Sequence, residues 1–307
     1  MPRRGKALFT ILALCAIASL NLSMSAQDGS STGKCGFQNL TIHSPAGTTA
    51  SPMALNDKGA FAGFLGLGSG ANFRIIGFLQ QSQGTFASFN FPGARDTLVH
   101  DMNTNGLIVG SFDNLSFSGQ RAFKVQNGAF HQVTIPGFPD APAVAEGVND
   151  LGDIVGDFNG NGTAFGFLLH NGKLTIISFP GAQGGTLPRS INNSGVVVGT
   201  YMLNEEDIPH GFMWKNGNFT NITAPGGLPA TPVKISNNGD IVGTFVDANL
   251  NEHGFSLDKG RFTVIDHPST SATAIFALND FDNILGVFFS QTTQGNVWFK
   301  GFCSSVF

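Results

Sequence analysis

From Ala54 to the end of the chain, apolar and polar positions follow one pattern that is written six times. Each copy begins with an Asn-x-x-Gly turn and continues into a short apolar segment such as Asp153–Phe158. A second apolar segment, as at Phe165–Leu169, leads through an Asn-Gly turn into an alternating strand that stops at a proline. Short apolar runs are typical of strands covered on both faces, and Asn-Gly favours a hairpin turn. With a short fourth strand, such as Thr186–Ile191, each copy predicts four antiparallel strands.

The period of this pattern predicts the architecture. The last position of the turn recurs every 43 to 47 residues, at Gly59, Gly106, Gly152, Gly195, Gly239 and Asp282. A repeat of this period stacks on its neighbours because it cannot bury its own apolar face alone. Four-stranded units of this length are characteristic of propellers, so we expect an all-β fold, a six-bladed β-propeller of four-stranded antiparallel blades. An open β-solenoid is the alternative. The glycine that recurs in the first strand, such as Gly156, is expected where a neighbouring sheet comes close.

The two ends of the repeat favour a closed ring over a solenoid. Phe37–Ile42, followed by Pro45, is a stray copy of the strand that stops at a proline. The corresponding segment at the other end, Phe302–Phe307, has no proline. We therefore expect the N-terminal strand to complete the last blade and close the ring. The expected domain is a single propeller over residues 35–307.

The first 26 residues have the layout of a secretory signal peptide. A basic start at Arg3, Arg4 and Lys6 is followed by an apolar stretch over Ala7–Leu22 and by small residues that a signal peptidase accepts. Residues 27–34 are then a short linker. An uncleaved membrane anchor is the alternative, but it needs about 20 apolar residues. We expect a secreted or periplasmic protein with no membrane span once the signal is removed.

Removal of the signal leaves two cysteines, Cys35 and Cys303, near the two ends of the mature chain. In an oxidising compartment such a pair predicts a disulfide bond, which would lock the closing strand. Two unpaired thiols are the alternative, because a sequence does not establish bridging geometry.

Composition narrows the range of partners. Charged residues make up only 12% of the chain, while Gly (41) and Phe (30) are abundant, which fits many turns and strands. The formal net charge of −4 comes without any cluster of Lys or Arg beyond residue 6. Because a nucleic-acid surface needs such a cluster, we expect no nucleic-acid partner. A monomer is the expected state.

The segment Ile191–Gly199, followed by His210–Trp214, resembles the bacterial extracellular HAF repeat, which is named for its His-Ala-Phe signature. The likeness covers most of the chain beyond Ala54, but the His of the signature stands only in the fourth and fifth copies. The resemblance implies a bacterial exported protein with a propeller-like fold. That family carries no established chemistry, so the resemblance implies no catalytic residue.

The connections between the second and third strands of the expected blades differ from copy to copy. They are Phe64–Arg74, Ser111–Arg121, Asp157–Ala164, Thr200–His210, Thr244–His253 and Val287–Asn296. Variation on one face of a repeat array often marks its binding face, although surface loops also vary without a function. The candidate binding residues are Arg95, Asp96, His100, Arg189, Asp207, His210 and His253.

One local motif suggests a metal. The segment Asp157–Gly162 fits the opening of a calcium loop, with Asp157, Asn159 and Asn161 as candidate ligands. The twelfth position is Leu168 rather than a carboxylate, so we favour a plain Asx turn and expect no cofactor.

No catalytic constellation is evident in the sequence. Asp266-His267 and His100-Asp101 are adjacent pairs, and adjacent strand residues point to opposite faces. Our leading hypothesis is a secreted, non-catalytic module that presents variable loops on one face to an extracellular protein or glycan. The alternative is a lyase or hydrolase, acting on a polysaccharide or a lactone, with its site at the channel mouth. A cluster of His or carboxylate side chains there would favour the enzyme.

Overall fold

The computed structural model describes residues 35–113, 119–160, 162–204, 208–268, 270, 272–290 and 295–302. Within these ranges the helical elements are two single 3-10 turns, η2 (Gly70–Asn72) and η3 (Pro225–Gly227). No helix in the described part of the chain is long and apolar enough to cross a membrane. The signal peptide and linker expected in residues 1–34 lie outside the described residues.

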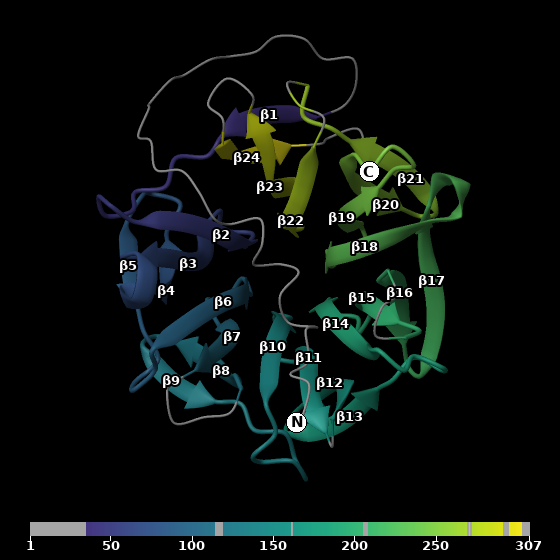
Figure 1. Cartoon of the computed structure of the whole chain (residues 1–307), viewed down its shortest axis with the longest axis horizontal. Coiled ribbons are helices and arrows are strands. Elements are labelled where there is room, and N and C mark those ends of the chain that lie inside the picture. The colour runs from purple at the N-terminus through teal and green to yellow at the C-terminus, as the bar shows by residue number, and fades with distance from the viewer. Residues whose placement is uncertain are drawn as a thin grey trace.

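The strands form antiparallel sheets that are arranged around a common centre (Figure 1). β2–β5, β6–β9 and β10–β13 are four-stranded sheets, β14–β21 form an eight-stranded sheet, and a further four-stranded sheet has the order β1-β24-β23-β22. Only Thr223↔Pro229 and Ala224↔Leu228 join β17 to β18, so the eight strands fall into two groups of four. The strands are β1 (Gly36–Asn39), β2 (Thr49–Leu55), β3 (Phe61–Leu67), β4 (Arg74–Gln80), β5 (Phe86–Phe89), β6 (Asp96–Met102), β7 (Ile108–Asp113), β8 (Arg121–Gln126), β9 (Ala129–Gln132), β10 (Ala143–Val148), β11 (Ile154–Gly160), β12 (Thr163–His170), β13 (Lys173–Ile177), β14 (Gly185–Ile191), β15 (Val197–Met202), β16 (His210–Lys215), β17 (Asn218–Ala224), β18 (Leu228–Ile235), β19 (Ile241–Val246), β20 (Glu252–Asp258), β21 (Arg261–Ile265), β22 (Thr273–Leu278), β23 (Asn283–Ser290) and β24 (Gly295–Phe302).

The sheets are offset by one strand from the sequence repeat. The strand before each Asn-x-x-Gly turn pairs with the strand after it, as β10 does with β11. The last strand of one sequence copy is therefore the first strand of the next sheet. We call these strands, β2, β6, β10, β14, β18 and β22, the inner strands, because they lie nearest the centre in Figure 1. The offset ties every copy to its neighbour through a shared sheet.

The N-terminal strand belongs to the last sheet. β1 pairs with β24 from Gly36↔Phe302 to Asn39↔Phe299, and the Leu40 N–H donates to the carbonyl of Trp298 at 2.9 Å. The Phe37 ring packs edge-on against Phe299 with a 5.1 Å separation of ring centres. Strand segments from opposite ends of the sequence thus share one sheet and one apolar cluster.

Each inner strand carries a register shift at the same place, three residues before the first position of the turn. In β10 the shift falls between Ala145 and Gly147, so Glu146 is the bulged residue. The bulged residues of the inner strands are Met53, His100, Glu146, Arg189, Val233 and Phe276. A bulge re-aims its side chain and adds local twist, so these positions leave the ordinary alternation of the strand.

The glycine that recurs after the Asn-x-x-Gly turn lies in the second strand of each sheet. The structure explains this glycine by a different contact from the one expected from the sequence. A Cβ atom at Gly156 would lie 2.0 Å from the carbonyl oxygen of Val144, which belongs to the inner strand of the same sheet. Gly110 and Gly199 meet the carbonyls of Leu98 and Leu187 in the same way. The expectation of a close neighbouring sheet is therefore wrong, because the crowding comes from the partner strand beside its bulge.

The core lies between the sheets. The third strand of each group buries one phenylalanine completely, and these residues are Phe78, Phe123, Phe167, Phe212, Phe255 and Phe299. One cluster combines Val109 and Ala122 of the β6–β9 sheet with Val148 and Phe167 of the β10–β13 sheet. Neighbouring sheets therefore depend on each other for apolar burial.

The strand connections divide the molecule into two faces. In antiparallel sheets, successive connections alternate between the two ends of the strands. The Asn-x-x-Gly and Asn-Gly turns share one end, which we call the turn face. The connections from second to third strands and those from one sheet to the next share the other end, which we call the loop face.

Candidate functional site

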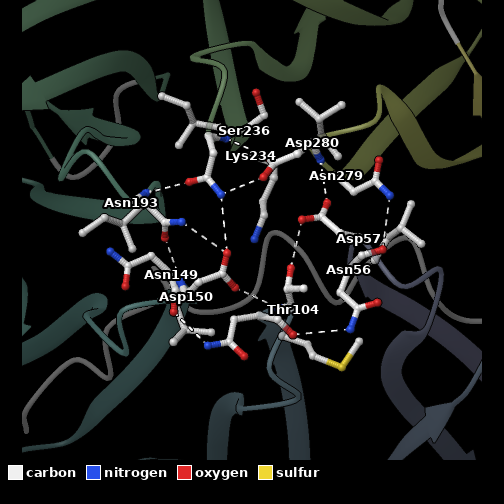
Figure 2. Close-up of a pocket in the computed structure, with 18 residues that line it drawn as sticks. Asn56, Asp57, Thr104, Asn149, Asp150, Asn193, Lys234, Ser236, Asn279 and Asp280 are labelled. Atoms are coloured by element: carbon white, nitrogen blue, oxygen red, sulfur yellow. Dashed lines mark hydrogen bonds between the residues drawn. The ribbon is translucent and has the colours of Figure 1, made fainter.

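The Asn-x-x-Gly turns converge at the centre of the turn face, around a small cavity (Figure 2). Its volume is about 50 Å³, and its lining is supplied mainly by the first and second residues of the turns. A cavity of that volume has room for a few water molecules but falls well below the roughly 300 Å³ of small-molecule sites. The geometry of the turns explains why so little space remains.

The first residue of each turn links that turn to the next. In the fourth copy, Asn192 Oδ1 accepts the N–H groups of Ser194 and Val196, while Nδ2 donates to the carbonyl of Ser236 at 3.1 Å. The same donation from Nδ2 to the carbonyl of the following turn occurs at Asn56 (3.4 Å), Asn103 (2.9 Å), Asn149 (3.1 Å) and, onto Asn56, at Asn279 (3.2 Å). Ser236 has no side-chain amide, and its hydroxyl group forms hydrogen bonds within its own turn, to Asp240. One buried amide thus shapes a turn and joins two copies.

The second residues of the turns form a parallel set of links. Asp150 N–H donates to Asn193 Oδ1 at 2.9 Å, Asn193 N–H to Asn237 Oδ1 at 2.8 Å, and Asn237 N–H to Asp280 Oδ1 at 2.6 Å. The series continues from Asp280 N–H to Asp57 Oδ1 at 2.8 Å. Carboxylate oxygens in this set already accept hydrogen bonds from neighbouring turns, as Figure 2 shows for Asp57, Asp150 and Asp280. This part of the centre is therefore a network that holds the fold together.

An ion pair crosses the centre below the turns. Lys234 Nζ of β18 lies 2.5 Å from Asp101 Oδ1 of β6, and the two side chains are only 13% and 5% exposed. Asp101 Oδ2 also accepts the Val148 N–H at 3.0 Å. Figure 2 shows the Lys234 side chain reaching into the space between the turns. The pair connects inner strands that are separated by 133 residues of sequence.

Three bulged residues on consecutive inner strands form a charged cluster. Arg189 Nη1 donates to Glu146 Oε1 at 2.6 Å, and His100 Nδ1 lies 3.3 Å from Glu146 Oε2. His100 Nε2 lies 3.2 Å from Ser111 Oγ. The side chains of Glu146, Arg189 and His100 are between 11% and 22% exposed. Asp157, on the strand beside β10, interacts electrostatically with all three.

The two carboxyl groups of this cluster differ in their acidity. Burial by itself would raise the pKa of Glu146, but the charges of Arg189 and His100 and hydrogen bonds from both hold it at about 2. Burial raises the pKa of Asp157 to about 7, with a further contribution from the Glu146 charge. Glu146 is thus ionised at neutral pH, whereas Asp157 is poised between its two forms. Carboxyl groups whose pKa values are pushed apart are a feature of acid–base sites.

The structure brings together only some of the candidate residues. His100 and Arg189 meet through Glu146, which the sequence analysis missed. Arg95 and Asp96 secure the start of β6: Arg95 donates to the carbonyl of Phe73, and Asp96 accepts the Ile75 N–H. Asp207 lies outside the described residues.

The two histidines that occupy equivalent positions have separate surroundings. His210 stacks on Tyr201 with a 5.4 Å separation of ring centres. His253 Nδ1 lies 2.9 Å from Asp266 Oδ1, and its Nε2 lies 3.3 Å from Asp247 Oδ2. Burial would lower the pKa of His253, but hydrogen bonds to Asp266 and Asp247 raise it above its usual value.

The missed residues left a signal in the repeat. Glu146, like the candidate Arg189, stands three residues before the first residue of a turn, and Asp101 and Lys234 each stand two before it. A charge inside a short apolar strand is unusual, because an unpaired charge is costly to bury. Alignment of the copies at the turn would have singled out these positions.

The calcium motif lies in and beyond a strand. Asp157 and Asn159 belong to β11, and Asn159 Oδ1 accepts the N–H of Gly162, three residues further on, at 2.9 Å. Asn161 lies outside the described residues, so neither the favoured plain turn nor the calcium alternative is tested there.

No family model and no curated protein matches the chain. Among solved structures, the β-propeller domain of the Trilobed protease from Pyrococcus furiosus is 8% identical with a TM-score of 0.51, over 83% of this chain and 93% of that one. A luciferin-regenerating enzyme is 9% identical with a TM-score of 0.51, over 89% and 96%. AofleA from Arthrobotrys oligospora is 13% identical with a TM-score of 0.51, over 89% and 88%. At such low identity these similarities show the fold alone, and with the repeated four-stranded sheets they define a β-propeller.

The turn network yields a test at Asn192. The Asn192→Ala variant loses the acceptor within its turn and the donor to Ser236, so we expect it to lower the free energy of unfolding by about 2–3 kcal/mol. Asn192→Ser keeps a hydroxyl acceptor, as at Ser236, and should lower the free energy of unfolding by about 1 kcal/mol. Chemical denaturation measures both, and Ser194→Ala, at an exposed position of the same turn, is the control. A Ser variant that is as stable as wild type would contradict a separate link between copies.

The charged cluster yields a test of pH dependence. Because the folded state holds the Asp157 proton up to a pKa of about 7, this carboxyl group contributes stability at low pH that is lost as pH rises from about 4 through 7. Asp157→Asn cannot ionise, so its free energy of unfolding relative to wild type should rise by about 1–3 kcal/mol between pH 5 and pH 8. Denaturation at both pH values gives the comparison, with the exposed Asp140→Asn as control. A difference that is the same at both pH values would show that Asp157 is not held protonated by its surroundings.

Proposed function

We propose that the chain is an exported, six-bladed β-propeller, closed into a ring by its N-terminal strand, that acts as a non-catalytic interaction module. Closure is supported by the pairing of β1 with β24 and by the bonds from Asn279 and Asp280 to the first turn. These contacts join the last copy to the first in the way that consecutive copies are joined. A ring of this kind has a fixed loop face on which several connections can contact one partner.

The export of the protein is supported by the position of its cysteines. Cys35 directly precedes Gly36, which pairs with Phe302, and Cys303 directly follows Phe302 in the sequence. Cys303 itself lies outside the described residues, so the disulfide bond stays a prediction. Such a bond would secure the closing strand in a secreted or periplasmic protein.

The disulfide bond is tested on protein recovered from an oxidising compartment. Alkylation before reduction should leave Cys35 and Cys303 unmodified, and alkylation after reduction should label both. Cys35→Ser, Cys303→Ser and the double variant should lose the same free energy of unfolding, up to about 4–5 kcal/mol, since one bond is removed in each. Labelling of either thiol in the unreduced protein would exclude the bond.

One observation carries the proposed binding role. Ten large apolar side chains are exposed among the described residues, and six of them lie on the loop face: Phe73, Phe138, Leu203, Ile208, Val246 and Leu250. Leu203 and Ile208 stand in the β15–β16 connection, and Val246 and Leu250 stand at the β19–β20 connection of the next group. Ile208 is 65% exposed and Leu250 is 86% exposed. Exposed apolar side chains on neighbouring connections of one face can form a contact site for another molecule.

The proposed partner is an extracellular protein or glycan, and the apolar loops favour a protein. The alternative function, a lyase or hydrolase acting on a polysaccharide or lactone, is favoured by the differing acidity of Glu146 and Asp157. The difficulty for this alternative is that a polysaccharide or lactone has little room to reach these carboxyl groups from the turn face. The cavity at the turn-face mouth measures about 50 Å³, and the ion pair of Lys234 with Asp101 crosses the centre.

The loop face is tested by photo-crosslinking. A crosslinking residue at Leu203, on the loop face, should give one discrete adduct with extracellular proteins of the producing cells, whereas one at Leu151, on the turn face, should give none. Unlabelled wild-type protein should compete, and Val246→Ser/Leu250→Ser should compete about tenfold less well, as expected for about 1.4 kcal/mol of lost apolar contact.

A glycan array, with and without calcium, provides the second arm of this experiment. Array binding that the same double variant weakens would assign the loop face to a glycan. Equal adducts from both faces, or no adduct and no array signal, would overturn the proposed role. Release of shortened glycans from the array would support the enzyme instead.

A further inference from the structure

In three of the groups, one position of the third strand packs into the seam to the next sheet. It directly follows the buried phenylalanine, and it is Leu79 in β4, Leu168 in β12 and Met213 in β16. Each of these side chains is half-buried and packs against the apolar cluster of the next sheet. The other groups have a polar residue there: Lys124, Ser256 or Lys300. Of these three, Ser256 is buried and Lys300 is half-buried, whereas Lys124, in β8, is exposed and does not belong to the cluster at its seam. The seam between β8–β9 and the β10–β13 sheet therefore lacks its apolar filler.

A groove of about 330 Å³ occupies this seam. Its apolar floor includes Val133 and Ile154, which are 8% and 4% exposed, together with Leu169. Lys124, Gln132 and Asn171 provide polar groups around it. This volume lies within the range of small-molecule sites, and an apolar floor with a few polar groups is their usual composition.

The charges around the groove select the kind of ligand. No carboxylate lines it, and the Lys124 ammonium makes no ion pair with any residue in the described part of the chain. An anionic ligand would therefore find a charge partner there that the fold has not already used. The side-chain amides of Gln132 and Asn171 can each donate and accept hydrogen bonds, as the hydroxyl groups of a sugar require.

We propose that this groove binds a carboxylated sugar residue, such as a uronic acid unit of an acidic polysaccharide. The Lys124 ammonium pairs with the sugar carboxylate, Gln132 and Asn171 bond to ring hydroxyls, and the apolar floor takes the carbon face of the ring. The site lies at the seam beside the turn face, since Gly152 and the Asn171-Gly172 turn also line it. It is separate from the loop face and does not depend on a partner there.

The probe for this site is a short galacturonic acid oligomer, with the neutral galactose oligomer for comparison, titrated by calorimetry into the full mature protein. Wild type should bind the acidic oligomer and not the neutral one, and binding should weaken with salt. Lys124→Leu restores the filler found at Leu79 and Leu168, so it should weaken binding about tenfold or more while leaving the melting temperature unchanged or higher. Lys124→Arg keeps the charge and should retain binding.

Lys215→Leu, at an exposed position on a different strand, is the matched control and should bind like wild type. The proposal is overturned if the acidic oligomer does not bind, if the neutral oligomer binds equally well, or if Lys124→Leu binds like wild type. Preferential binding of a poly-aspartate peptide would overturn it too, since the groove would then select charge without sugar. Val246→Ser/Leu250→Ser should not change this binding, so failure here and failure of the loop-face proposal are distinguishable.

Discussion

The structure depends on a single kind of side-chain amide, which begins every Asn-x-x-Gly turn except the one that starts at Ser236. The side-chain oxygen of Asn192 accepts hydrogen bonds within its own turn, and the side-chain NH2 group donates a hydrogen bond to the backbone of the next turn. These side chains are buried, so losing the hydrogen bonds of either the oxygen or the NH2 group would destabilise the fold. Local turn formation and the stacking of copies are thereby coupled in one group. Ser236 keeps the bond within its own turn but lacks the amide that would reach the next turn. The second residues of the neighbouring turns are still joined by hydrogen bonds, which explains why a serine is tolerated there.

The inner-strand bulge is a second constraint, and it leaves a side chain free to vary. The bulge is accommodated by the backbone and by the glycine opposite, such as Gly156 beside Val144. The bulged residue itself has no fixed part in that arrangement, so it can be Met53 in one copy and Glu146 in another. His100, Glu146 and Arg189 on consecutive inner strands are the result. A charged cluster can be built there without disturbing the repeat.

The sequence predicted the features that recur and missed those that depend on one copy meeting another. Asn-x-x-Gly turns, Asn-Gly hairpins and apolar strands follow from local chemistry, and the structure has them where the pattern indicates. The role of Gly156 was misjudged because its neighbour is set by a bulge that no local signal announces. The contact of Glu146 with His100 and Arg189 joins residues 46 and 43 positions away, and the Lys234–Asp101 pair spans 133. Such contacts follow from how sheets are arranged around the centre, which the period suggests but does not specify.

The same repetition decides where recognition can occur. At the centre, equivalent residues from the copies meet and form hydrogen bonds with one another, so the cavity that remains has a volume of about 50 Å³. Binding energy for a ligand is available only where polar or apolar groups have not been used by the fold. Those places are where copies differ: the loop-face connections around Leu203 and Leu250, and the seam at which Lys124 replaces an apolar filler. In this chain the regular part of the repeat supplies rigidity, and departures from regularity supply the surfaces for binding.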